Sequence, residues 1–148
     1  MHQRSFPTTA ALLCAAVVLS ACNRAPEVAL APQSSARVCR SVAWPGTVSG
    51  HARVATQPDD ASVAAWGDPA IFARCGLDPL GPTTDSCVTV DGVDWVVRPL
   101  SDGSKATTFG RTPAIEVLAP STYGPVPLLL PAFTAAAKAL PTNGRHCS

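Results

Sequence analysis

The chain has 148 residues, of which 47% are hydrophobic and 14% are charged, and its formal net charge is +1. This length suits a single domain. Ten basic and ten acidic residues follow the N-terminal segment, so the charge gives no reason to expect nucleic acid or an anionic surface as a partner.

The first residues are built like a secretory signal. A cationic start at Arg4 precedes an apolar run over 10–19, which is about half of what a helix needs to cross a bilayer core. The run ends in Leu19-Ser20-Ala21-Cys22, which resembles the lipobox of bacterial lipoproteins. We therefore expect residues 1–21 to be removed and Cys22 to carry diacylglycerol on the outer face of the cytoplasmic membrane. Simple secretion with an incidental cysteine is the alternative, but Leu19 fits ordinary signal cleavage poorly.

The remaining cysteines predict two disulfides. Cys14 lies in the expected signal, and the four others form an even set in an exported domain: Cys39, Cys75, Cys87 and Cys147. Of the three possible pairings we prefer Cys75–Cys87, which closes a short loop rich in glycine and proline, together with Cys39–Cys147. A zinc site is the alternative, but the chain has no Cys-x-x-Cys and no ligand pair at zinc spacing beside His146.

Residues 22–35 have the composition of a flexible tether. They contain Pro26 and Pro32, few apolar residues and no periodicity, and a free segment of this length would reach roughly 20 Å. We therefore expect a single folded domain over 36–148.

The clearest local signal in this domain is a hairpin over Cys87–Val97. Asp91-Gly92 between alternating apolar residues predicts a two-residue turn that places Val90 opposite Val93 and Val88 opposite Trp95. The other side of this hairpin is then formed by Thr89, Asp94 and Val96. Further strands are expected at Val63–Trp66, Ala70–Cys75, Thr107–Phe109 and Ala114–Ala119, with Ile115 and Val117 inward and Glu116 outward.

Two helices are expected at the ends of the domain. A short one is predicted over Ala36–Val42, and a longer one over Pro131–Leu140, where proline suits the first position and alanine favours helix. The order helix, strands, helix predicts an α+β fold, with a small antiparallel β-sheet, a short N-terminal helix and a C-terminal helix, stapled by two disulfides.

Several short segments of the chain form a recurring set: Cys39-Arg40, Ala65–Ile71, Arg74–Gly76, Val90–Trp95 and Thr108–Val117, followed by the expected C-terminal helix and Cys147. Together these segments resemble one family, the actinobacterial envelope proteins known as domain of unknown function 3515. The resemblance covers nearly the whole region from Cys39 to Cys147. It implies one exported domain with paired cysteines and assigns no activity.

No established catalytic motif occurs in the sequence. Serine hydrolase signatures and glycine-rich phosphate loops are missing. Two histidines, His51 and His146, follow Cys22, and neither lies in a known catalytic motif. Three carboxylates could form an acid/base pair: Asp68, Asp94 and Glu116. Arginines on the same sheet, Arg74, Arg98 and Arg111, could instead pair with these carboxylates on a solvated face.

These observations favour a non-catalytic binding or accessory module whose partner is an envelope protein or a cell-wall component. We expect no cofactor, no metal and no nucleic acid. The candidate binding patch consists of Trp66, Asp68, Arg74, Asp94, Arg111 and Glu116. The alternative is an enzyme of cell-wall metabolism that uses two carboxylates among Asp68, Asp94 and Glu116, which should then converge in a concave pocket.

Overall fold

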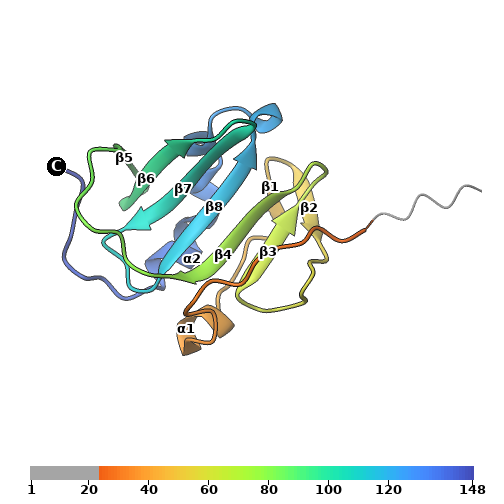
Figure 1. Cartoon of the computed structure of the whole chain (residues 1–148), viewed down its shortest axis with the longest axis horizontal. Helices are drawn as coiled ribbons and strands as arrows, with labels where there is room; N and C mark the ends of the chain where they lie inside the picture. The colour runs from red at the N-terminus through yellow and green to blue at the C-terminus, as the bar shows by residue number, and fades with distance from the viewer. Residues whose placement is uncertain (1–23) are drawn as a thin grey trace, which may run out of the picture.

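The computed structural model describes residues 24–148, whose strands form one eight-stranded antiparallel sheet in the order β1-β2-β3-β4-β8-β7-β6-β5 (Figure 1). The expected signal peptide and Cys22 lie outside the described residues. The strands are β1 (Thr47–Val48), β2 (His51–Val54), β3 (Val63–Trp66), β4 (Ile71–Leu77), β5 (Ser86–Val90), β6 (Val93–Pro99), β7 (Gly103–Phe109) and β8 (Ala114–Pro120). The helical segments are α1 (Arg37–Arg40), η1 (Ser121–Tyr123), η2 (Val126–Leu128), η3 (Leu130–Phe133) and α2 (Thr134–Lys138).

The predicted α+β class is wrong, because the fold is mostly one large antiparallel sheet. The expected N-terminal helix is reduced to the single turn of α1, and the expected C-terminal helix is a 3₁₀ turn followed by the five residues of α2. Pro131 and Pro141 confine the alanine-rich stretch to fewer than three turns, a length at which helix propensity contributes little. The stretch nevertheless buries the expected apolar stripe, which consists of Phe133, Ala136, Ala137 and Leu140.

The hairpin prediction is confirmed in detail. Val90 pairs with Val93, Val88 with Trp95, and Thr89 with Asp94. Asp91 and Gly92 both have positive φ angles, as a type I′ turn requires. The strand predicted at Val63–Trp66 has the same bounds as β3, and the other predicted strands are longer than expected. No strand was expected at the positions of β1 and β2.

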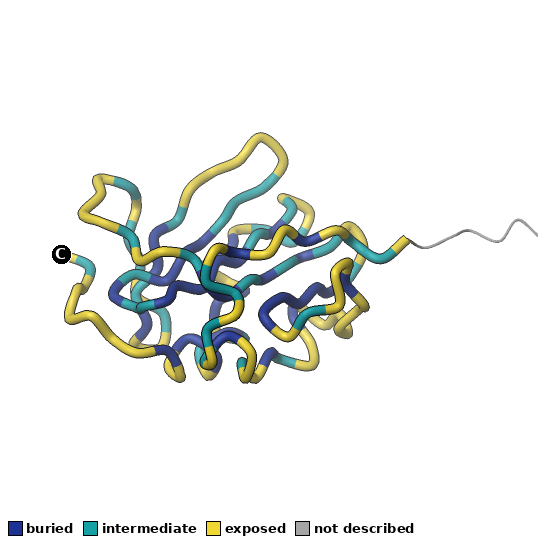
Figure 2. The backbone as a smooth tube through the Cα atoms, turned by 60° about the horizontal axis from the view of Figure 1, so that its bottom comes forward, coloured by how far each residue is buried: buried dark blue, intermediate teal, exposed yellow. Residues whose placement is uncertain are grey.

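The two faces of the sheet differ in what covers them. The inner face packs against η2, η3 and α2, and the Trp66 and Phe133 rings meet edge to face there, with centroids 5.3 Å apart. One transverse row of this face consists of Val88, Trp95, Thr108, Ile115 and Cys75. The neighbouring row on the outer face consists of Cys87, Val96, Thr107, Glu116 and Arg74. Buried positions follow the middle of the strands and the segments packed on the inner face, whereas the turns are exposed (Figure 2).

The four cysteines form two disulfides, as expected, but the preferred pairing of Cys75 with Cys87 and of Cys39 with Cys147 is wrong. The bonds join Cys39 to Cys75 and Cys87 to Cys147, with Cα–Cα distances of 5.3 and 5.7 Å. Cys75 on β4 and Cys87 on β5 are separated by four strand spacings, or about 19 Å. This distance far exceeds the reach of a disulfide. The first bond lies on the inner face and the second on the outer face.

Residues 26–35, which were expected to belong to a free tether, instead pack onto the outer face. The Val28 N–H donates to the Gln57 carbonyl at 2.9 Å, and the Gln33 N–H donates to the Gly76 carbonyl at 2.8 Å. Val28 and Ala31 are each only 4% exposed. Gly76 permits this contact, because a Cβ at that position would lie 2.5 Å from the backbone of Gln33. The segment is therefore part of the folded domain.

Candidate functional site

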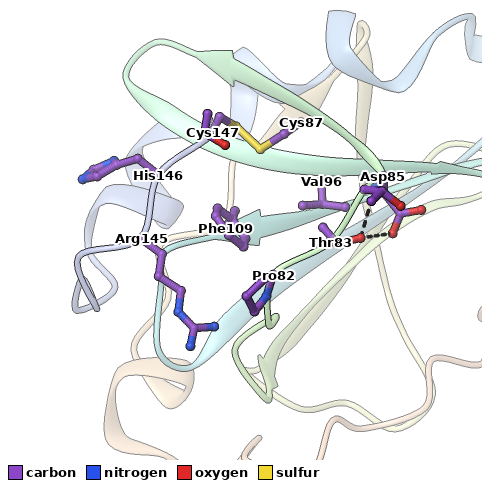
Figure 3. Close-up of a pocket in the computed structure, with 11 residues that line it drawn as sticks. Pro82, Thr83, Asp85, Cys87, Val96, Phe109, Arg145, His146 and Cys147 are labelled. Atoms are coloured by element: carbon purple, nitrogen blue, oxygen red, sulfur yellow. Dashed lines mark hydrogen bonds between the residues drawn. A yellow bond between two sulfur atoms is a disulfide. The ribbon is translucent and has the colours of Figure 1, made fainter.

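A cavity of about 490 Å³ lies on the outer face at the β5 edge of the sheet (Figure 3). Its floor consists of Cys87, Val96 and Phe109, which β5, β6 and β7 direct to the same face. One wall is the connection over 82–85 and the other is the C-terminal segment over 145–148. The cavity is therefore held between two segments that the sheet itself brings together.

The first wall is fixed by side-chain hydrogen bonds. The Thr83 hydroxyl donates to an Asp85 carboxylate oxygen at 2.6 Å and accepts from the Asp85 N–H at 3.1 Å. The Arg98 Nε on β6 donates to the same carboxylate at 2.7 Å. The hydrogen bond from Thr83 and the Arg98 guanidinium lower the pKa of Asp85. Asp85 is therefore held ionised on the rim, as one half of an ion pair with Arg98.

The second wall is tied to the sheet at several points. The Cys87–Cys147 disulfide joins it to β5, and the Arg145 guanidinium donates to the Leu80 carbonyl at 2.8 Å. Gly110 lies beneath this segment, and a Cβ there would be 2.1 Å from the Arg145 carbonyl oxygen. In Figure 3, Arg145 extends toward Pro82, whereas the His146 ring points away from the cavity.

Asp94 holds the C-terminal segment from below. Its carboxylate accepts from the Cys147 N–H at 2.9 Å and from the Thr89 hydroxyl at 2.6 Å, and it lies 3.4 Å from His146 Nδ1. Partial burial raises the pKa of Asp94 and is the largest single influence. The hydrogen bonds and His146 together outweigh burial, so the pKa of Asp94 lies below its usual value. Asp94 acts here as an anchor for the wall of the cavity.

This anchoring should weaken in acid. Because the pKa of Asp94 is lower in the folded chain than in the unfolded chain, its stabilising contribution is present above the unfolded value of about 3.9. That contribution is lost as the pH falls through the folded value. In NMR spectra, the Cys147 amide resonance should titrate with a midpoint below about 3.9. Asp94→Asn should abolish this titration, and a midpoint at or above the ordinary value would contradict the assignment.

The predicted binding patch does not form one surface. Trp66 is completely buried, and its indole N–H donates to the Pro45 carbonyl at 2.9 Å. Asp68 lies exposed in the turn between β3 and β4, and Arg111 donates to the Leu140 carbonyl at 2.9 Å, where it fixes the end of the α2 region. Of the six residues, only Asp94 contacts the segment that walls the cavity. The six residues therefore do not form a single exposed patch.

Glu116 was expected to point outward on a solvated face, where an arginine such as Arg74 could pair with it; it does pair with Arg74, but it is only 2% exposed. The Arg74 guanidinium donates to one of its oxygens through Nε at 2.9 Å and through a terminal nitrogen at 2.8 Å. Lys105 Nζ lies 3.4 Å from the other oxygen. Alternation correctly assigned Glu116 to the face opposite Ile115, but Arg74 and Lys105 lie over it. Its carboxylate is engaged in a structural ion-pair cluster.

The carboxylates named for an enzymatic alternative do not converge. Asp94 is engaged by the C-terminal segment, Glu116 by the cluster with Arg74 and Lys105, and Asp68 lies in an exposed turn. β7 separates the strands that carry Asp94 and Glu116. Within residues 24–148 the three carboxylates are therefore held apart, so they do not meet the geometric requirement for an acid/base pair.

The cavity residues were missed by the sequence analysis, apart from the disulfide cysteines. One feature of the sequence did point to the cavity. Val96 falls on the polar side of the predicted hairpin, and an apolar side chain there indicates that another segment of the chain packs over it. Phe109 follows the same alternation on β7. The two walls gave no such signal, because they come from irregular segments.

The cavity combines an apolar floor with polar walls, an arrangement suited to binding. One terminal nitrogen of Arg145 donates to Leu80, and its remaining N–H groups have no hydrogen-bond partner within 24–148. Those groups can receive an anionic oxygen. The described residues contain no group of three or more side chains suited to hold a metal ion. They also contain no helix that is long and apolar enough to cross a membrane.

Comparison with known proteins gives one match. No curated protein and no solved structure is significantly similar to the chain. The family model described as "Protein of unknown function (DUF3515)" matches residues 5–143, which is almost the whole sequence. The chain therefore belongs to this family of proteins of unknown function.

Proposed function

We propose that this protein is an actinobacterial envelope lipoprotein, anchored through Cys22 to the outer face of the cytoplasmic membrane, whose domain binds an envelope partner without catalysis. The observation that carries the anchoring is Cys22 at the end of a cationic and apolar leader. Two acyl chains on this cysteine would suffice for stable membrane attachment.

Two further observations support export. The four cysteines after Cys22 form two disulfides, which persist in oxidising compartments outside the cytoplasm. The family match begins at residue 5, so it includes the apolar run and Cys22. Residues 5–22 are thus part of what the chain shares with its family.

Metabolic labelling with an alkyne fatty acid tests the anchor. We expect wild-type protein to incorporate the label and Cys22→Ser to lose it, because only the thiol of Cys22 accepts the lipid. Cys14→Ser is the matched control, since it changes a cysteine within the apolar run and should leave labelling unchanged. Equal labelling of the wild type and Cys22→Ser would contradict the proposal.

The binding role rests on the cavity at the β5 edge. A partner with an apolar group could rest against Phe109, which is partly exposed above the buried Val96, and a carboxylate on that partner could reach Arg145. Acidic peptide segments of envelope proteins and of the cell wall have this chemistry. The three carboxylates proposed for enzymatic acid/base work do not converge, so no specific observation favours the enzymatic alternative.

Filling the cavity should abolish partner binding without disturbing the fold. Thr84 lines the cavity, is exposed and makes no side-chain hydrogen bond within 24–148, so Thr84→Trp adds bulk without removing a contact. Ser101→Trp, in the exposed turn between β6 and β7, is the matched control. In-cell crosslinking should recover envelope partners with wild type and Ser101→Trp but not with Thr84→Trp. Undiminished crosslinking of Thr84→Trp would remove the cavity from consideration.

A further inference from the structure

The packed N-terminal segment restricts where the domain can sit relative to the expected lipid. Hydrogen bonding to the domain begins at Pro26, whose carbonyl accepts from the Gln57 N–H at 2.9 Å, and continues at Val28. Glu27 and Gln57 also form a parallel bridge. The chain between Cys22 and the first fixed residue is therefore very short.

Covalent geometry gives an upper limit for this distance. Four residue steps separate Cys22 from Pro26, and a fully extended chain spans at most about 3.6 Å per residue. Pro26 can therefore lie no more than about 14 Å from Cys22. This limit replaces the reach of roughly 20 Å expected for a free tether of residues 22–35.

The surface around this entry point is formed by β2 and the turn between β3 and β4. Arg24, Pro26, His51, Val54 and Asp68 line one hollow of about 510 Å³ there. All four residues of β2 are exposed, including 37% of Val54. Within 24–148, neither Arg24 nor Arg53 on β2 forms an ion pair, so both guanidinium groups are available to lipid phosphates.

The binding cavity lies at the opposite edge of the sheet. Six strand spacings separate β2 from β5, a distance of about 29 Å. Residue 24 and the C-terminus lie at opposite ends of the longest axis in Figure 1, and they remain at opposite ends in Figure 2. The link from Pro26 is therefore too short to bring the attachment point at Cys22 to the cavity.

We infer that the end of the sheet formed by β1 and β2, with Arg24, His51 and Arg53, rests against the lipid headgroups, and that the cavity at the β5 edge faces away from the membrane. This inference rests on the proposed lipidation of Cys22. The short link imposes the orientation, so no strong surface charge is required. Asp68 and Glu27 are also near the entry point and keep this surface from being strongly cationic.

The two histidines that follow Cys22 provide matched reporters at the two ends. His51 is exposed on β2, and the side chain of His146 at the cavity edge is 78% exposed. The lipidated protein would be reconstituted on the outside of phosphatidylcholine–phosphatidylglycerol vesicles. Modification of each histidine by diethyl pyrocarbonate would then be followed by peptide mass spectrometry.

The control lengthens the link while keeping the lipid. A Gly/Ser insertion of about 20 residues between Asn23 and Arg24 has a mean reach of roughly 25 Å and frees the domain to rotate. We expect His51 to react several-fold more slowly, relative to His146, in the wild type than in the insertion variant. Both proteins should remain on the vesicles.

The outcomes separate orientation from anchoring. If both proteins cosediment with vesicles and the ratio of His51 to His146 modification is the same in each, the orientation is wrong and the anchor stands. If the protein purified from membranes carries no lipid and does not cosediment, the proposed anchor fails, and the orientation fails with it. Slower modification of His146 than of His51 in the wild type would reverse the assignment of the two ends.

Discussion

Replacing both Cys39 and Cys75 by alanine should lower the free energy of unfolding by about 4 kcal/mol. The two cysteines are 36 residues apart, and restricting a loop of this length in the unfolded chain accounts for that figure in the chain-entropy model. Both are completely buried, so the bond also fixes α1 against the inner face of the sheet. Urea unfolding followed by tryptophan fluorescence would measure the loss.

The second disulfide is the internal control for this prediction. Its separation of 60 residues gives a similar figure, about 4 kcal/mol, in the same model. However, Cys87 and Cys147 are partly exposed, and the bond holds a terminal segment whose residues 141–146 are all exposed. Cys87→Ala/Cys147→Ala should therefore release this segment and lower global stability less. A larger loss for this pair than for Cys39 and Cys75 would contradict the account.

Arg74→Ala should lower the free energy of unfolding by about 3 kcal/mol, which is the lower end of the range for breaking a buried ion pair. The substitution leaves Glu116, whose side chain is 3% exposed, with only Lys105 at 3.4 Å. The cost falls at the lower end because the Arg74 side chain itself is 28% exposed and Lys105 remains in place.

The double substitution Arg74→Leu/Glu116→Leu tests the reason for this loss. It removes both charges together, so no buried carboxylate is left without its partner, and it should be much less destabilising than Arg74→Ala. Urea unfolding of both variants at neutral pH provides the comparison. Wild-type stability in Arg74→Ala would show that the cluster does not support the fold.

The parts of the fold that were predictable depend on local signals. Asp91-Gly92 determines a turn on its own, and the alternation around it then determines which side chains share a face, so the hairpin register could be read directly. The burial of Ile115 and Val117 follows from the same period. These predictions needed no knowledge of the strand order.

The cysteine pairing could be predicted only from the order of the strands in the sheet. β8 inserts beside β4, so the strand that follows β4 in sequence lies at the far edge of the sheet. Nothing local to Cys75 or Cys87 encodes this arrangement. The sequence around Pro26 also did not distinguish a free tether from a packed segment, because an extended segment that packs on a sheet can have the same composition as a tether. Gly76 admits this segment, but its role appears only once the two are side by side.

The candidate site shows the same limit. Charged residues were chosen because charge on a sheet can mark recognition, yet Arg74, Glu116 and Arg111 are engaged in contacts within the domain. The cavity instead depends on where the C-terminal segment and the connection after β4 cross the outer face. The tertiary fold determines where these segments cross. Only the apolar floor of the cavity could therefore be inferred from the sequence, through the alternation around Val96.

Intact mass spectrometry of the protein extracted from membranes tests the central claim most directly. We predict one species whose mass equals the chain from Cys22 onward, with a diacylglycerol group added and four hydrogen atoms lost to the two disulfides. Reduction should restore those hydrogens without removing the lipid. A species that carries no lipid, or that begins at a residue other than Cys22, would contradict the proposal that this protein is a membrane-anchored lipoprotein.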